Sequence, residues 1–164
     1  MSVELGRVEL DRLLALEQKF AKEGLTFDDV LLVPAESLVG HEFDEEDLAA
    51  ALDEIADLGA RNVIVTQDTG CYALLREDRD ELRVRARAPH VEPTSTVGAG
   101  DTLLAGFIAA RVSGRSFDDA VRSAVAAGAA SVLEPGPGRF DPREASRLTP
   151  LVTLERLEPI AQDA

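Results

Sequence analysis

One short segment constrains the fold of this chain more than any other: residues 96–101, with the sequence TVGAGD, lead directly into the small, apolar run of residues 102–110. Such a run predicts a helix that begins at Thr102. Two glycines and an alanine ahead of a helix leave backbone N–H groups uncovered, and the helix N-terminus adds partial positive charge. The segment therefore predicts an anion-binding turn formed by Gly98, Ala99 and Gly100.

Asp101 is the unexpected member of this turn, because a carboxylate would repel a bound phosphate. One interpretation is that Asp101 accepts a proton from a hydroxyl group that attacks the phosphate. The alternative is that Asp101 only caps the helix, since aspartate is a favoured N-cap residue. The spacing alone leaves both interpretations open.

Composition restricts the class of protein. The 164 residues suffice for one domain with a sizeable core, and the hydrophobic content of 45 % excludes a disordered chain. Aromatic residues make up only 4 %, so we expect an aliphatic core. The net charge of −14 argues against nucleic acid or an anionic membrane as a partner, because both bind basic surfaces.

The single cysteine and the two histidines predict neither a disulfide nor a zinc site. Cys71 has no partner for an intramolecular bridge, and we expect it to behave as a small hydrophobic residue. His41 and His90 lack partners at the spacing of metal ligands. Since no apolar run approaches the length of a membrane span, we expect a cytoplasmic protein.

Hydrophobic periodicity predicts alternating helices and strands. Helices are expected at 4–23, 45–58, 102–112, 117–133 and 141–147, and strands at 29–33, 62–66, 72–76, 82–88 and 151–154. This alternation indicates a three-layer α/β fold with a mainly parallel sheet and helices on both faces. Arg83, Arg85 and Arg87 alternate along one predicted strand, which is typical of a solvated edge-strand face.

Residues 95–107 (STVGAGDTLLAGF) resemble the second signature of the ribokinase-like (PfkB) sugar kinases. The resemblance extends from about residue 38 to residue 157 and is carried mainly by 94–133 and 141–144. It favours the branch of 1-phosphofructokinase and tagatose-6-phosphate kinase. Members of this family are normally nearly twice as long as the present chain.

The resemblance implies ATP and Mg²⁺ as cofactors, with Asp101 as the base and the N–H groups of Ala99, Gly100 and Asp101 facing the transferring phosphate. Residues 66–71 (TQDTGC) match the family turn that contacts nucleotide, normally TLGxxG, but Asp68 replaces the first glycine. Thr66 and Gly70 are therefore nucleotide-binding candidates, and a plain turn between strands is the alternative.

Ala127 and Gly128 fall where the family helix approaches the adenine ring. The alternative is that these small residues only allow close packing of two helices. The family's Asn-x-x-Glu motif, which helps to place magnesium and phosphate, should begin near Ala35 and is missing, and Glu36 is out of phase with it. The metal ligands therefore stay unassigned.

Residues 22–37 (KEGLTFDDVLLVPAES) resemble the opening of bacterial IMP dehydrogenase instead. The sequence therefore divides into a helix–strand segment at 1–37 and a kinase-like part at 38–164. None of the dehydrogenase's catalytic features follows, so no such activity is assigned to the segment.

The resemblance implies phosphoryl transfer from ATP to a hexose phosphate such as fructose 1-phosphate, impaired if the sugar-binding half is absent. The alternative is a non-catalytic chimeric fragment that folds and at most binds nucleotide. An open sheet edge and an exposed apolar face would favour a homodimer.

Overall fold

The computed structural model describes residues 31–34, 45–77 and 80–158. In chain order, the elements are β1 (Leu31–Pro34), α2 (Glu45–Asp57), β2 (Val63–Gln67), β3 (Gly70–Glu77), β4 (Asp80–Arg87), α3 (Ala99–Val112), α4 (Phe117–Ser131), α5 (Pro142–Leu148), the 3-10 helix η2 (Thr149–Leu151) and β5 (Thr153–Arg156). The predicted helix at 4–23 and most of the segment 1–37 lie outside the described residues.

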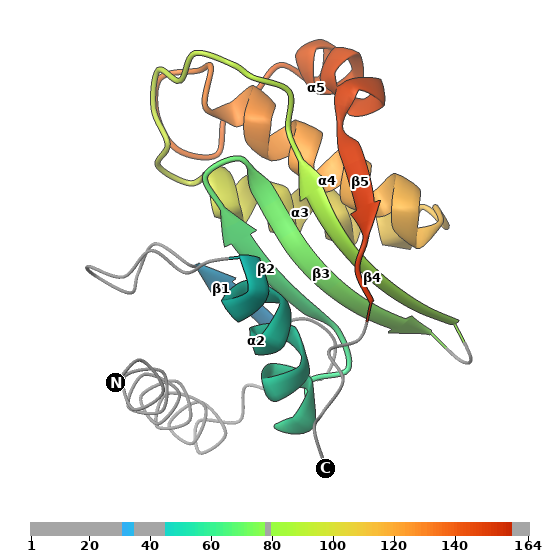
Figure 1. The fold of residues 1–164 in the computed structure, drawn as a ribbon. Coiled ribbons are helices and arrows are strands. Elements are labelled where there is room, and N and C mark those ends of the chain that lie inside the picture. Colours follow the sequence, from blue (N-terminus) through green and yellow to red (C-terminus); the bar gives the residue numbers. More distant parts are fainter. Residues whose placement is uncertain (1–30, 35–44, 78–79, 159–164) are drawn as a thin grey trace, which may run out of the picture.

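The strands form one sheet in the order β1-β2-β3-β4-β5 (Figure 1). Only β1 and β2 run parallel, and the other three neighbouring pairs of the described sheet are antiparallel. The prediction of a mainly parallel sheet is therefore wrong for this part of the chain. The reason is the length of the connections: Asp68 and Thr69 alone join β2 to β3, and a two-residue turn can link only antiparallel strands.

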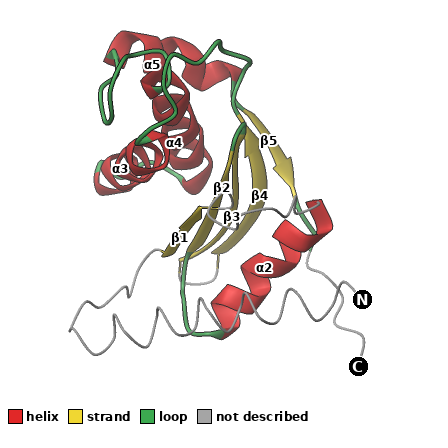
Figure 2. Cartoon of the chain, turned by 90° about the vertical axis from the view of Figure 1, so that its left-hand side faces the viewer, coloured by secondary structure: helices red, strands yellow, loops and turns green. Residues whose placement is uncertain are grey.

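Helices cover both faces of the sheet, as predicted (Figure 2). One face packs against α3, α4 and α5, and its core includes the side chains of Ile64, Leu75, Val84 and Phe107. The opposite face packs against α2 in a smaller core. We call these the α3/α4 face and the α2 face.

Strand β3 contributes to both cores because successive side chains of a strand point to opposite sides. Cys71, Ala73 and Leu75 lie on the α3/α4 face, whereas Tyr72 and Leu74 lie on the α2 face. All five are buried, so β3 is the shared wall of the two cores.

The position of β4 contradicts the prediction that Arg83, Arg85 and Arg87 lie on an edge strand. It lies between β3 and β5 and is not an edge strand in the described sheet. Arg83 donates to both carboxylate oxygens of Asp53 on α2, at 2.6 and 2.8 Å, and its side chain is only 11 % exposed. It also contacts Glu81 at 2.7 Å. Arg83 therefore belongs to a partly buried ion-pair network, whereas Arg87 is exposed.

Small residues bring α3 and α4 into close contact. A Cβ atom at Gly106 would lie 3.1 Å from the Cβ of Ala127, and one at Gly128 would lie 3.3 Å from the backbone oxygen of Ala99. The Ser116 side chain caps α4 by accepting from the Asp119 N–H, as its position in the sequence predicts.

Candidate phosphate-binding turn

Helix α3 begins three residues earlier than the sequence predicts. Gly98 is its N-cap residue and has φ 80° and ψ 8°, a left-handed conformation that favours glycine. Asp101 therefore lies in the first turn and is not the N-cap, so the capping interpretation is wrong. The helix starts at Ala99 because the Ala99 N–H closes a turn onto the Thr96 oxygen at 3.2 Å.

The first turn of α3 presents backbone donors at the helix N-terminus. The sequence predicts three free N–H groups, but that of Ala99 already donates to Thr96. The N–H groups of Gly100 and Asp101 have no hydrogen-bond partner among the described residues. Two donors in line with the helix dipole suit one oxygen pair of a phosphate group.

The carboxylate of Asp101 is exposed and makes no hydrogen bond or ion pair within the part of the chain that the structure describes. The neighbouring Thr102 is buried, and its hydroxyl donates to the Gly98 oxygen at 2.8 Å. Thr102 therefore stabilises the turn, while Asp101 is available to accept a proton. The general-base role of Asp101 stays a prediction.

A second loop, residues 132–141, supports the turn and was not singled out as functional by the sequence. A Cβ atom at Gly98 would lie 3.0 Å from the Pro137 Cβ and 3.1 Å from the Gly138 nitrogen. The same loop accepts hydrogen bonds at the Val132 oxygen from the N–H groups of Thr94 and Ser95. Glycine is therefore favoured at position 98 for two reasons: its φ is positive, and Pro137 leaves no room for a side chain.

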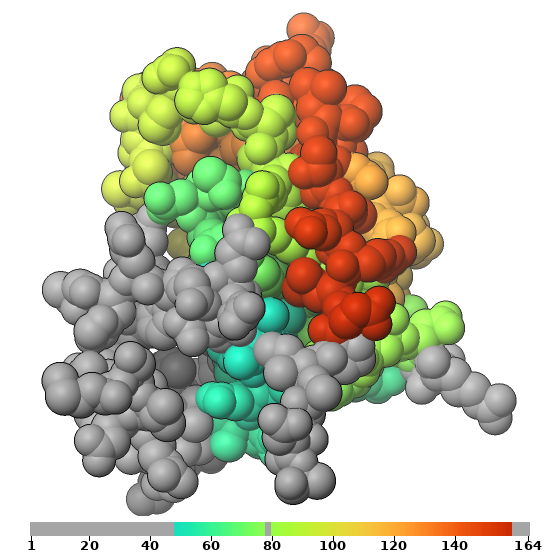
Figure 3. Space-filling model, viewed as in Figure 1, coloured from blue at the N-terminus to red at the C-terminus, as the bar shows by residue number. Residues whose placement is uncertain are grey.

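The two loops lie side by side above the end of the sheet (Figure 1). In the space-filling view, the residues that precede α3 form the upper rim of the visible face, next to α5 and β5 (Figure 3). The sequence signal for this support was the PGPG run at 135–138, which predicts a rigid loop but does not reveal what the loop contacts.

Thr66 and Gly70 lie at the β2–β3 turn, as the plain-turn interpretation predicts. Gly70 is required there by space, because a Cβ atom would lie 2.0 Å from the Ala86 oxygen on the paired strand. The Thr69 oxygen accepts a hydrogen bond from the Ala88 N–H at 2.7 Å, so the turn contacts the start of the segment that leads to Gly98. A nucleotide contact at Thr66 or Gly70 stays a prediction.

Ala127 and Gly128 lie in the contact between α4 and α3. Ala127 is 4 % exposed, and the space beside Gly128 is filled by Ala99 and Leu103. Helix packing therefore accounts for both small residues, and contact with an adenine ring stays a prediction.

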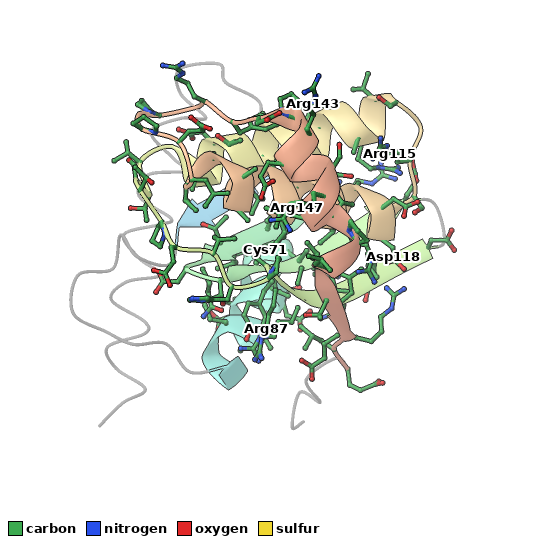
Figure 4. All side chains as sticks on the ribbon, turned by 90° about the horizontal axis from the view of Figure 1, so that it is seen from above. Cys71, Arg87, Arg115, Asp118, Arg143 and Arg147 are labelled. Atoms are coloured by element: carbon green, nitrogen blue, oxygen red, sulfur yellow. The ribbon has the colours of Figure 1, made fainter. Side chains whose placement is uncertain are left out.

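Metal ligands and reactive groups are sparse in the described part of the chain. No cluster of three or more His, Cys, Asp or Glu side chains occurs there that could hold a metal ion. Burial raises the pKa of the Cys71 thiol to about 12, so this cysteine is a core residue and not a nucleophile (Figure 4). No helix among the described residues combines the length and apolar character that crossing a membrane requires.

The described elements form an α/β protein with a glycine-rich turn at the start of a helix, and sequence comparison identifies the family. Residues 34–144 match the model of the pfkB family carbohydrate kinases. The chain therefore belongs to the pfkB family. Nothing in the comparisons shows an IMP dehydrogenase segment at residues 22–37, so that resemblance remains without support.

Two curated relatives illustrate the extent of the similarity. The 1-phosphofructokinase of Borreliella burgdorferi is 30 % identical over 100 residues, which cover 60 % of this chain and 32 % of the relative. The ribokinase of Haemophilus influenzae is 32 % identical over 125 residues, which cover 76 % of this chain and 38 % of the relative. The chain thus spans about a third of the length of these relatives.

Solved structures show the same fold. The phosphofructokinase-2 of Escherichia coli in complex with potassium is 25 % identical, with a TM-score of 0.61 over 75 % of this chain and 40 % of that one. The ribokinase of Thermotoga maritima gives a TM-score of 0.53 at 22 % identity, over 75 % of this chain and 42 % of that chain. The described elements therefore form part of a ribokinase-like fold.

Proposed function

We propose that this chain supplies the phosphate-binding turn and the general base for ATP-dependent phosphorylation of a hexose phosphate, as in 1-phosphofructokinase. One observation carries the proposal: an exposed, unpaired Asp101 carboxylate lies in the first turn of α3 beside two free backbone N–H groups. Membership of the pfkB family supports phosphoryl transfer to a sugar as the reaction class.

In this proposal, the chain's residues divide the work between binding and proton transfer. The N–H groups of Gly100 and Asp101 bind the phosphoryl oxygens, and Gly98 keeps the turn open because no side chain intrudes beside Pro137. The Asp101 carboxylate takes the proton of the sugar hydroxyl as the hydroxyl oxygen bonds to the γ-phosphorus of ATP and the bond from that phosphorus to the leaving ADP oxygen breaks. When bound, Mg·ATP supplies the phosphoryl group and the charge neutralisation.

A second candidate is nucleotide binding without turnover. It is favoured by the extent of the match, which covers only 32 % of the 1-phosphofructokinase and 38 % of the ribokinase. In that case the turn at Gly98 would bind phosphate, and the sugar hydroxyl would not reach Asp101.

Calorimetric titration with Mg·ATP and a coupled assay with fructose 1-phosphate distinguish the two candidates. Asp101→Asn should lower kcat by about 10²–10⁴-fold, the usual contribution of a general base, and leave nucleotide binding intact. Asp118→Asn is the matched control, because Asp118 is an acid in the first turn of the neighbouring helix α4 (Figure 4).

Each outcome decides between the candidates. Turnover that falls in the Asp101 variant and not in the Asp118 variant supports the kinase proposal. Binding of Mg·ATP without turnover supports the second candidate. No binding at millimolar nucleotide would contradict both.

A further inference from the structure

A cavity at the opposite end of α3 is not used by the proposed function. Its volume is about 290 Å³, and it lies between the C-terminal half of α3, the start of α4 and the ends of β2 and β3 that are remote from Gly98. The lining residues are Arg61, Asn62, Arg76, Glu77, Phe107, Ile108, Arg111, Val112 and Phe117. Because α3 has 14 residues, this cavity is about 20 Å from the phosphate-binding turn.

The polar side of the cavity offers hydrogen-bond donors for an anion. Arg61 is exposed and forms no ion pair with any residue that the structure describes. The Asn62 side-chain oxygen accepts the Arg76 N–H at 2.8 Å, so the Asn62 amide group is oriented with its NH₂ left to donate. Two donors of different geometry therefore lie side by side at the start of β2.

The other charges of the lining are already paired. Arg76 contacts Glu81 at 2.8 Å, and Arg111 contacts Glu77 at 2.5 Å. Three guanidinium groups and one carboxylate thus line the cavity, in a chain whose net charge is −14. Because Glu81 and Glu77 neutralise Arg76 and Arg111, the positive charge that is left to attract an anionic ligand is that of Arg61.

The apolar side of the cavity is unusually open to water. Ile108 is 48 % exposed and Val112 is 84 % exposed, and both lie on the exposed side of α3, whose buried residues are Thr102, Leu103, Phe107 and Ala110. Arg111 stacks on the Phe117 ring at 4.3 Å and donates to the backbone oxygen of Arg115, on the turn before α4 (Figure 4). The wall is therefore held in place and can cover an apolar group.

We propose that this cavity binds a small amphipathic organic anion, with its phosphate or carboxylate group on Arg61 and Asn62 and its apolar body against Ile108 and Val112. Charge complementarity selects the anion, and the exposed apolar wall selects a ligand with an aromatic or branched aliphatic body. This site is independent of the Gly98 turn, although α3 connects the two.

The test is a titration of the ¹⁵N-labelled full chain with phenyl phosphate, followed by amide chemical shifts. We expect saturable shifts at Asn62, Ile108 and Val112. Inorganic phosphate lacks the apolar body and benzyl alcohol lacks the charge, so each should bind at least about tenfold more weakly.

Two variants assign the binding to the named residues. Arg61→Ala should raise the Kd for phenyl phosphate about tenfold, because it removes a charge-assisted contact. Arg143→Ala is the control, since Arg143 is an exposed arginine on α5, away from the cavity (Figure 4). Both sites are on the surface, so folding should be unaffected.

Three results would overturn the proposal. The first is an Arg61→Ala variant that binds phenyl phosphate as well as the wild type does. The second is a set of shifts confined to residues 98–101, which would show that the probe binds the phosphate turn instead. The third is slow amide exchange at Val112 without any response to the probe, which would show that polypeptide covers the cavity.

Discussion

The two faces of the sheet are built in different ways. The α3/α4 face has an apolar core in which glycine and alanine bring two helices into contact. Its described core contains no charged side chain. The α2 face carries the ion-pair network of Arg83, Asp53 and Glu81, together with Arg85 at 5.3 Å from the Tyr72 ring centroid. Close apolar packing thus positions the helix that bears the candidate site, whereas the other face combines a smaller apolar core with charged contacts.

The largest expected effect comes from removing a buried side chain from the core of the α3/α4 face. Phe107→Ala should lower the free energy of unfolding by about 3–5 kcal/mol, because a buried aromatic ring leaves a cavity behind. Phe107 is 4 % exposed and belongs to the core beneath α3. Urea unfolding followed by circular dichroism measures the change, and a loss below about 1 kcal/mol would contradict this role of α3.

Overfilling the same face tests its close packing. Gly128→Val should cost about 1–3 kcal/mol, because the new side chain meets the Ala99 oxygen and Leu103. Ala109→Val places the same side chain on an exposed position of α3 and serves as the control. Equal unfolding free energies for the two variants would show that the helix contact is not close.

On the α2 face, the key contact is the double hydrogen bond between Arg83 and Asp53. Asp53→Asn should destabilise the fold by about 1–2 kcal/mol, since it leaves a largely buried guanidinium half-paired. Glu144→Gln breaks the ion pair with Arg147 on the surface of α5, and we expect no measurable change there. Chemical denaturation of both variants at low salt compares the pairs.

The smallest effect concerns pH. Hydrogen bonds from Arg76 and Arg83 hold the pKa of Glu81 below its ordinary value. A lowered pKa in the folded state stabilises the fold above the unfolded-state pKa of about 4.3, and that contribution is lost as the pH falls further. Glu81→Gln should therefore flatten the decline of the unfolding free energy in this acidic range. Parallel curves for variant and wild type would refute the assignment.

The sequence predicts most of the individual helices and strands, but it does not predict the direction in which the strands pair. The run at 62–66 predicts β2, and Ser116 predicts the start of α4, because both signals are local. The parallel sheet was a wrong inference from the alternation of elements. The turns at 67–70 and 77–81 are too short to connect parallel strands, so their length requires antiparallel neighbours.

One signature in the sequence predicts the candidate site, but no signal in the sequence predicts the residues that support it. Asp101 and the glycines of the turn are local in sequence. The contact of Gly98 with Pro137 joins residues almost forty positions apart, and no periodicity encodes it. Likewise, the arginines of β4 look like an exposed stripe until Asp53 of α2 is placed opposite Arg83.

The close approach of Gly70 to the Ala86 oxygen fixes the start of β3 against β4, so the β2–β3 turn should tolerate changes in length poorly. Because β3 faces both cores, one inserted residue between Asp68 and Thr69 would shift its register and send Tyr72 and Leu74 to the opposite side. A single inserted residue would then disrupt the packing of both cores. The turn after α3 is exposed at Ser113 and Gly114 and joins two helices, so a length change there would leave the register of the sheet intact.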